Sequence, residues 1–275
     1  MPRPFQIGRL VRPFCVMTSA FRYRATRLLL CTFTAMLPAC AASNDQPNAC
    51  LSIEHRQEAT LQYIVDGDTL VLSDQRKVRV LGINTPETRP SPQPNALAAM
   101  QAAKTLLPVN TKIWIYPGIE ARDHHGRALA HVVSPDGTNL AEHLLSNGLA
   151  ASSAVHPNTR CAEHYQQLER QARNNKLGLW SEPHPWQLID QRINKKRSGF
   201  RLVTSTVSSI KANSQYHHLQ LANGLRLSMT NKLAKEIHAS KLQDERLTVR
   251  GWIQWRKNKA SLRLHHAANL QRHSD

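Results

Sequence analysis

Short alternating apolar segments set close together constrain most strongly what this chain can fold into. Leu61, Tyr63 and Val65 are predicted to share one face of a first strand, and Leu70–Leu72 and Val78–Ile83 follow as two further strand candidates. Asp66-Gly67 marks a tight turn between the first two. The four prolines at 86, 90, 92 and 94 require a loop after the third strand. Three short strands in direct succession are typical of a small β-structure rather than a helical bundle.

Helices and further strands alternate in the segment that follows. An alanine-rich helix is predicted over 95–107, and a helix around 140–145 has Gly148 as its C-terminal cap. A polar helix is predicted over 161–175, and strands are predicted over 113–116 and 127–133. Three strands, a strand pair and helices favour a small closed barrel with attached helices over residues 59–183.

The C-terminal third differs from this segment in charge. Residues 51–185 hold 13 basic and 13 acidic residues, whereas residues 186–275 hold 17 basic and 5 acidic residues, a net charge of +12. This unevenness excludes a uniformly basic, histone-like protein, and it indicates a polyanionic partner for the C-terminal part. A solvated basic surface is the alternative interpretation.

Strand signals resume after the prolines at 183 and 185. We expect strands over 201–210, 218–221, 225–229, 247–255 and 262–265, with a short helix over 231–238. Residues 186–275 are therefore predicted to form a second all-β unit, about the size of a five-stranded barrel.

The N-terminal segment has the features of an export signal. Basic residues precede an apolar run over 28–37, which is too short to span a bilayer. Leu37-Pro38-Ala39-Cys40 resembles a bacterial lipobox, which predicts lipidation of Cys40, although Pro38 departs from that pattern. Ordinary signal-peptidase cleavage and free secretion is the alternative. We expect a leader over 1–40, a tether over 41–58, and an exported protein of the periplasm or cell envelope.

The cysteine positions agree with export. Of five cysteines, only Cys50 and Cys161 lie beyond the leader and the predicted lipidation site. In an oxidising compartment this pair favours a disulfide, and two free thiols are the alternative. The sequence contains no CxxC or HExxH motif, so it gives little support to a zinc site.

Acidic, amide and arginine residues gather at the ends of the predicted strands. Asp68 lies in the first turn, Arg79 lies inside the third strand, Asn84 and Glu87 begin the proline-rich loop, and Arg127 opens a later strand. Carboxylate, amide and carbonyl oxygens suit a hard cation such as Ca²⁺, and two guanidinium groups can grip a phosphate. Such a set fits phosphoryl displacement. A hairpin turn with surface charges is the alternative.

The wording and order of these segments resemble a known family. VDGDT (65–69), KVRVLGINTPET (77–88), DHHGRALA (123–130) and LGLWSEP (177–183) occur in the order typical of the thermonuclease, or staphylococcal-nuclease-like, family. The resemblance covers about residues 60–182. It implies an OB-type five-stranded barrel with three helices and cleavage of phosphodiester bonds in DNA and RNA with Ca²⁺, Mg²⁺ being the alternative ion.

The resemblance also implies roles for individual residues. The metal-binding aspartate of the family falls on Asp68, and the metal-ligating backbone carbonyl falls on Thr85. The phosphate-clamping arginines fall on Arg79 and Arg127, and the catalytic glutamate falls on Glu87. These matches predict a catalytic set of Arg79, Glu87 and Arg127.

Three departures from the family pattern bear on activity. The second metal aspartate of the family falls on Asn84, which brings no negative charge, so metal affinity should drop. His125 replaces a tyrosine, and the tyrosines that follow the Gly148-Leu149-Ala150 segment in the family are absent, so base stacking there is in doubt. A catalytically weakened, nucleic-acid-binding lipoprotein with the nuclease fold is therefore the alternative to an active nuclease.

The C-terminal unit has a weaker resemblance of its own. Residues 247–253 and 262–264 resemble the last strands of an OB-fold module that is appended to some bacterial nuclease-like proteins. Tyr216, Arg250, Trp252 and Trp255 are the predicted nucleic-acid contacts of this unit, with packing in the core as the alternative for the tryptophans. DNA and RNA are the expected partners, a membrane is expected only through the lipid, and the sequence indicates no protein partner.

Overall fold

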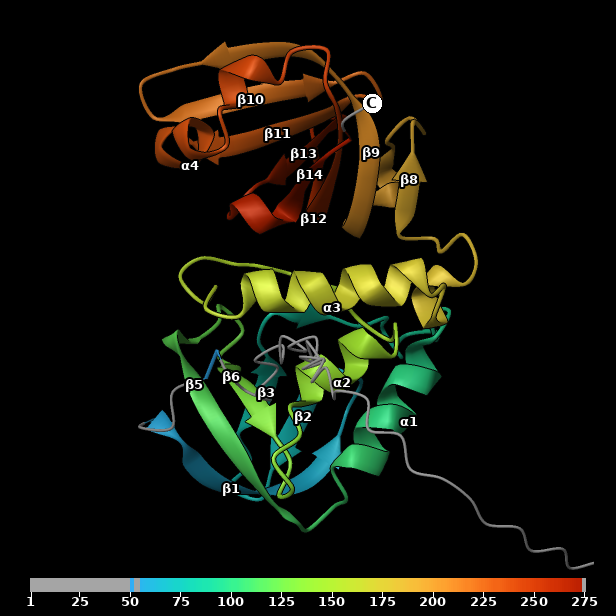
Figure 1. Ribbon diagram of the computed structural model, residues 1–275, viewed down its shortest axis with the longest axis vertical. Helices are drawn as coiled ribbons and strands as arrows, with labels where there is room; N and C mark the ends of the chain where they lie inside the picture. The colour runs from blue at the N-terminus through green and yellow to red at the C-terminus, as the bar shows by residue number, and fades with distance from the viewer. Residues whose placement is uncertain (1–49, 52–54, 274–275) are drawn as a thin grey trace, which may run out of the picture. The chain divides into compact units, whose positions relative to one another are not determined.

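The computed structural model describes residues 50–51 and 55–273, which belong to one compact unit. The leader over 1–40, with Cys40, lies outside the described residues. Two five-stranded barrels make up the fold, one in each half of the described chain (Figure 1). This arrangement confirms the predicted fold class. The first barrel has the strand order β1-β2-β3-β6-β5 and closes between β5 and β1. Its strands are β1 (Gln57–Ile64), β2 (Thr69–Leu72), β3 (Lys77–Val80), β5 (Lys112–Arg122) and β6 (Ala128–Val133).

The first strand departs from strict alternation. A register shift lies between Leu61 and Tyr63 where β1 pairs with β2, so Leu61 and Ile64 are buried while Tyr63 is 46% exposed. The prediction that Leu61, Tyr63 and Val65 share one face is therefore wrong, because a bulge changes which side chains face the core. The remaining core comes from Leu70 and Leu72 of β2 and from the inward residues of the other strands.

Three helices complete the first barrel at the predicted places: α1 (Ala96–Leu106), α2 (Leu140–Ser146) and α3 (Ala162–Asn174). Asn139 caps α2, because its side-chain oxygen accepts the backbone N–H of Ala141 at 2.9 Å. Gly148 follows α2 with a φ of +66°, which agrees with its predicted capping role. Two short strands that the sequence did not predict, β4 (Ile83–Asn84) and β7 (Ala151–Ser152), pair with one another.

A disulfide fastens the start of the described chain to the first barrel. Cys50 and Cys161 are bonded, as predicted, and Cys50 and Leu51 pack against the barrel core. Because β1 begins at Gln57, the barrel starts inside the segment that was predicted as a tether over 41–58. The loop that the disulfide closes spans 111 residues. In the chain-entropy description, a loop of that length stabilises the folded state by about 4–5 kcal/mol.

The second barrel repeats the connectivity of the first. Its strands pair in the order β9-β10-β11-β13-β12, and β12 pairs with β9 to close the barrel. In each barrel the third and fifth strands are parallel, and a helix lies between the third and fourth strands. Its elements are β9 (Gly199–Ala212), β10 (Tyr216–Leu221), β11 (Leu225–Thr230), α4 (Asn231–Glu236), β12 (Arg246–Arg256) and β13 (Lys259–Arg263), with β8 (Gln187–Ile189) and β14 (Leu270–Arg272) added at β9 and β12.

The two barrels share a packed joint. An apolar cluster includes Leu179 and Trp180 from the first half and Trp186, Phe200 and Leu202 from the second. Polar contacts cross the same joint: Asn269 accepts the backbone N–H of Ala154 at 3.0 Å and donates to its carbonyl at 2.6 Å. The second barrel is therefore packed on the first rather than joined to it by an extended linker. In the part of the chain that the structure describes, no helix is long and apolar enough to cross a bilayer.

Candidate active site

Asp68 is the centre of the polar cluster at the mouth of the first barrel. It lies in the turn between β1 and β2 and is only 5% exposed. Its Oδ2 accepts the backbone N–H of Thr85 at 2.6 Å, which links this turn to the segment after β4. Asp66 accepts the backbone N–H of Asp68 at 3.0 Å and so holds the turn from inside. The buried carboxylate thus occupies a fixed position.

Arg79 connects three of the predicted site segments. It lies on β3, and its Nη1 is 2.6 Å from Asp68 Oδ1. Its Nη2 donates to Asn84 Oδ1 at 2.9 Å and to the carbonyl of Ile83 at 3.1 Å. One guanidinium therefore bridges the aspartate and the asparagine that were both predicted as metal ligands.

Glu87 lies on the proline-rich loop, where the residue is exposed but its carboxyl group is partly buried. Two hydrogen bonds to Gln93 close this loop: the Glu87 N–H donates to Gln93 Oε1 at 3.2 Å, and the Gln93 N–H donates to the Glu87 carbonyl at 2.9 Å. Gln93 Oε1 also accepts the indole N–H of Trp186 at 3.2 Å. His184 and the carbonyl of Pro94 lie 3.3 Å apart and add a second contact between this loop and the segment after the first barrel. Nothing in the sequence pattern indicated a role for Gln93 or Trp186.

Arg127 lies directly before β6 and is held by Asp123. Its Nε donates to Asp123 Oδ2 at 2.7 Å, while Asp123 Oδ1 accepts the backbone N–H of Arg127 at 2.9 Å. A hollow of about 340 Å³ adjoins Arg127. Four cationic side chains and one acidic side chain line it: Arg76, Lys77, Arg122, Arg127 and Asp74. Because Asp74 is paired with Arg76 at 2.7 Å, the hollow has an excess of positive charge.

The charged groups of the site influence one another's ionisation. Burial, followed by the charge of Asp68, raises the pKa of Asp66 to about 7. Burial and Asp68 also raise the pKa of Glu87, against the opposing effect of Arg79 and Arg127. Asp68, Arg79, Glu87 and Arg127 are therefore close enough to form one electrostatic unit. Direct contacts join Asp68, Arg79 and Asn84, whereas Glu87 and Arg127 are linked to them by electrostatic influence alone.

The oxygen atoms around Asp68 suit a hard cation. The set consists of the Asp68 carboxylate, the Asn84 amide and the backbone carbonyl of Thr85. Thr85 Oγ1 is buried and makes no hydrogen bond within the described residues, so the site contains a polar oxygen that lacks a protein partner. No group of three His, Cys, Asp or Glu side chains arranged to hold a metal occurs in residues 50–51 and 55–273. The residues fit a site with one carboxylate and neutral oxygen ligands.

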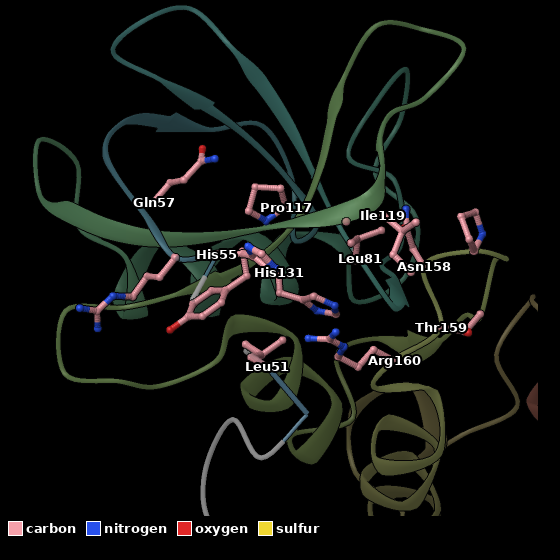
Figure 2. Close-up of a pocket in the computed structure, with 14 residues that line it drawn as sticks. Leu51, His55, Gln57, Leu81, Pro117, Ile119, His131, Asn158, Thr159 and Arg160 are labelled. Carbon is pink, nitrogen blue, oxygen red and sulfur yellow. The ribbon is translucent and has the colours of Figure 1, made fainter. Parts of the chain in front are cut away.

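A larger hollow lies apart from the predicted catalytic residues. It has a volume of about 560 Å³ and contains none of Asp68, Arg79, Glu87 or Arg127 in its lining. Figure 2 shows His131 and Arg160 side by side in it, next to Leu51. Burial, with a smaller effect of Arg160, lowers the pKa of His131 to about 4, and His131 Nδ1 lies 2.9 Å from the hydroxyl of Tyr165. This histidine is a neutral, buried part of the fold.

The four residues predicted as nucleic-acid contacts of the second barrel differ in their surroundings. Arg250 is 4% exposed, forms an ion pair with Glu169 of α3 and donates to Ser152 Oγ at 2.6 Å. The prediction for Arg250 is corrected, because its charge is neutralised inside the joint. Trp255 packs against the core, while Trp252 is 44% exposed and packs at its edge on Phe200. Tyr216 is partly exposed and lies under Arg263.

Comparison with known proteins shows the family to which the first barrel is similar. The staphylococcal nuclease homologue family matches residues 77–182. The thermonuclease of Staphylococcus hyicus is 31% identical over 141 residues, which cover 49% of this chain and 82% of the relative. The chain belongs to the staphylococcal nuclease family. This finding confirms the family that the four sequence segments indicated.

The matched segment covers a smaller share of two other relatives. Endonuclease YhcR of Bacillus subtilis (strain 168) is 26% identical over 196 residues, or 66% of this chain and 16% of the relative. Endonuclease YncB of the same organism is 35% identical over 130 residues, or 45% of this chain and 61% of the relative. The chain therefore spans less than two thirds of the length of these two relatives.

Proposed function

We propose that this chain is an exported, metal-dependent nuclease that hydrolyses phosphodiester bonds of DNA and RNA. The observation that carries the proposal is the joining of Asp68, Arg79 and Asn84 by contacts of 2.6 and 2.9 Å, with Glu87 and Arg127 in the same electrostatic unit. The names thermonuclease and endonuclease of its relatives support the same reaction class. The cationic hollow beside Arg127 suits a polyanionic substrate.

Asp68, Asn84 and the carbonyl of Thr85 would hold the metal ion, for which we propose Ca²⁺, with Mg²⁺ as the alternative. When bound, such an ion supplies positive charge that polarises a phosphate oxygen. Arg79 contacts both Asp68 and Asn84, so its guanidinium keeps these oxygens in place and lies where a phosphate would bind. The two roles explain why a single arginine has neighbours on three segments.

The remaining residues perform the proton transfer and stabilise charge. The Glu87 carboxylate orients the attacking water and accepts its proton, for which a raised pKa makes it a better base than a free glutamate. As the water attacks phosphorus in line, the bond from phosphorus to the 5′-oxygen breaks, and the departing 5′-oxygen is stabilised by Arg127 and takes a proton from solvent. The guanidinium groups of Arg79 and Arg127 bind the equatorial phosphate oxygens, whose negative charge increases in the transition state. Asp123 fixes the plane of the Arg127 guanidinium for this contact.

The second barrel is proposed to bind the nucleic acid, and the protein is proposed to be a lipoprotein of the cell envelope. The net charge of +12 over residues 186–275 supports the first statement. The Cys50–Cys161 disulfide supports an oxidising compartment outside the cytosol. Cys40 is the proposed lipidation site.

A catalytically weakened nucleic-acid-binding protein is the second candidate, and Asn84 is the observation that favours it. Asn84 brings no charge to the proposed metal site, and its amide oxygen already accepts a hydrogen bond from Arg79. Metal affinity is thereby lowered on two counts.

Cleavage assays separate the two candidates. Purified protein is incubated with labelled DNA and RNA in the presence of Ca²⁺, Mg²⁺ or EDTA. We expect cleavage with Ca²⁺, no cleavage in EDTA, and loss of cleavage in Glu87→Gln. Glu163→Gln, which makes the same change at an exposed carboxylate of α3, is the matched control and should retain full activity. Binding of nucleic acid without cleavage under all metal conditions would contradict the nuclease and favour the second candidate.

A further inference from the structure

One outward face of the second barrel is built from three adjacent strands. Cross-strand pairs join Tyr216 to Thr230, His218 to Ser228, and Gln220 to Arg226, while Ser228 also pairs with Arg263 of β13. Because neighbouring residues in register point to the same side of a sheet, these side chains lie on one surface. We define the strand face as Tyr216, His218, Gln220, Arg226, Ser228 and Arg263.

The alternate residues of the same strands form the barrel core, so the strand face is directed away from it. Leu219 and Leu221 of β10, Leu227 and Met229 of β11, and Leu262 of β13 are all buried. Arg226 and Arg263 are exposed. The two arginines therefore remain available to a partner in solution.

The strand face lies on strands that carry basic side chains and no acidic ones. None of the five strands of the second barrel contains an aspartate or glutamate. Burial, followed by the charges of Arg226 and His217, lowers the pKa of His218, which places these cationic groups close together. Like charges on one surface oppose folding slightly, and a polyanion bound there would offset their repulsion.

An aromatic ring lies among these cations. The guanidinium of Arg263 is 5.4 Å from the centre of the Tyr216 ring, and its Nη2 donates to the tyrosine hydroxyl at 3.3 Å. The His218 ring is nearly parallel to that of Tyr216, at 28° and 6.3 Å between centres. His218 Nδ1 is itself fixed by Ser228 Oγ at 3.0 Å. Planar groups that are held beside exposed cations provide stacking surfaces for bases and contacts for phosphates.

We infer that the strand face binds single-stranded nucleic acid, with bases stacked on Tyr216 and His218 and phosphates on Arg226 and Arg263. The inference rests on the proposed function, because it assumes that the substrate is a polynucleotide. A single strand is favoured over a duplex because the bases of a duplex are already stacked on one another and cannot reach Tyr216. Tyr216 thus belongs to a set that the sequence did not reveal, and Arg250 does not belong to it.

The chain beyond Arg263 leads from the strand face to the first barrel. Burial lowers the pKa of His265, and the charges of Arg263 and then His156 lower it further. His265 therefore lies close to His156 of the first barrel. A few residues after His265, the backbone carbonyl of Ala268 accepts a hydrogen bond from the side chain of Gln166 in α3 at 3.0 Å. A strand held on this face therefore lies on the same protein unit as the catalytic cluster, and its local concentration there is raised.

Binding is measured by fluorescence anisotropy with labelled oligothymidylate and with a duplex of equal length. The full chain is used in EDTA, and the oligonucleotide is recovered to verify that it is intact. Tyr216→Ala should weaken single-strand binding by about tenfold, the effect of losing one stacked base. Tyr216→Phe keeps the ring and should retain affinity within about twofold. Arg226→Gln/Arg263→Gln should make the log–log salt slope less negative by about 1.4.

The matched control removes the same charge elsewhere on the second barrel. Lys235→Gln/Lys241→Gln neutralises two exposed cations at and beyond α4 and should leave the salt slope nearly unchanged. An equal loss in the control, full affinity in Tyr216→Ala, or duplex binding as tight as single-strand binding and equally sensitive to Tyr216 would each overturn the inference. Cleavage of a dinucleotide is assayed on the same proteins. If the unmodified protein does not cleave the dinucleotide, the proposed nuclease activity is refuted, irrespective of whether the oligonucleotide binds to the strand face.

Discussion

The two barrels have the same connectivity but place their polar groups differently. In the first barrel the candidate site buries two carboxyl groups in a turn, at Asp66 and Asp68, and neutral polar side chains in the segment that holds Asn84 and Thr85. In the second barrel the core is formed by leucine, valine, isoleucine, alanine and methionine side chains, and, apart from Arg250 in the joint, the charged side chains of the strands are exposed or partly exposed. The shared strand order supplies a rigid frame in both cases, and the chemistry depends on what the turns and faces add to it.

The difference follows from what each task requires. A reaction at phosphorus needs charged groups that converge on one point in a site of low dielectric constant, which turns at a barrel mouth can provide. Attachment of a polymer needs an extended and solvated surface, which a strand face provides. The joint between the barrels then keeps the two surfaces on one body.

The largest expected effect tests the convergent site. Arg79→Ala or Arg127→Ala should lower the rate on a dinucleotide substrate by about a thousandfold, because each guanidinium is assigned to charge that develops in the transition state. The measurement is kcat and KM at saturating Ca²⁺. Arg170→Ala provides the arginine control on α3. Retention of the full rate by both variants, when the unmodified protein cleaves, would show that the site is misassigned.

The second effect concerns the joint. Arg250→Met should lower the free energy of unfolding by about 3 kcal/mol, because the carboxylate of Glu169 stays buried and loses one of its two cationic partners. Burial alone would raise the pKa of the Glu169 carboxyl. The charges of Arg250 and Arg173 nevertheless hold this pKa below its usual range. Denaturant titration at pH 7 measures the change.

A double-mutant cycle distinguishes the pair from its surroundings. Arg250→Met combined with Glu169→Gln should cost less than the sum of the two single variants, since the buried carboxylate is removed together with Arg250 and only Arg173, whose side chain is 26% exposed, loses its acidic partner. Additive losses would contradict a direct role for the ion pair in fastening the barrels. Because the joint is packed in this way, removing residues 186–275 would also expose Leu179 and Trp180, which pack against Trp186, Phe200 and Leu202 of the removed segment.

Much of the candidate site could be predicted from the sequence because its residues lie in short contiguous segments. Asp68 and Arg79 belong to segments whose order alone indicated a family, and the Cys50–Cys161 pair followed from counting cysteines. The strands of the second barrel were also predicted from alternation. In each case the signal is local in the chain or depends only on order.

What could not be predicted depends on contacts between distant residues. Arg250 lies in a strand of basic and apolar residues, and only the packing of α3 shows that Glu169 neutralises it. Tyr63 is exposed because a bulge in β1 changes the register, and alternation gives no sign of the extra residue. Gln93 and Trp186 are 93 residues apart, and neither lies in a recognisable motif.

A titration of stability against pH tests the buried histidine of the first barrel. Burial lowers the pKa of His131 from the ordinary histidine value of 6.5, which applies to the unfolded chain, to about 4 in the folded protein. The contribution of the neutral ring to stability is fully present above pH 6.5. It is lost as the pH falls toward 4, because in this interval the unfolded chain takes up a proton and the folded protein does not. Unfolding free energy should fall by about 3 kcal/mol across this interval through His131 alone. His131→Asn should remove this part of the decrease, and an unchanged profile would contradict the assignment.

Metal dependence sharpens the role of Asn84. Asn84→Asp restores a carboxylate to the proposed site and should lower the Ca²⁺ concentration for half-maximal rate by about tenfold, the effect of about 1.4 kcal/mol of added binding energy. Asn258→Asp adds the same charge to an exposed turn of the second barrel and is the control. Equal Ca²⁺ dependence in all three proteins would show that residue 84 is not a ligand.

The smallest effect concerns the hydrogen bond between Trp186, which precedes the second barrel, and Gln93 of the proline-rich loop. Trp186→Phe keeps a ring against Phe200 and removes the N–H that donates to Gln93, which also bonds the backbone of Glu87. One neutral hydrogen bond is worth about 1 kcal/mol, so kcat should fall by about fivefold if that contact positions Glu87. KM and the melting temperature should change little. Trp180→Phe is the matched control, because the Trp180 indole N–H is buried without a hydrogen-bond partner among the described residues. An equal fall in kcat for both variants would assign the effect to general packing at the joint, and a fall for Trp186→Phe alone would show that the loop depends on its contact beyond the first barrel.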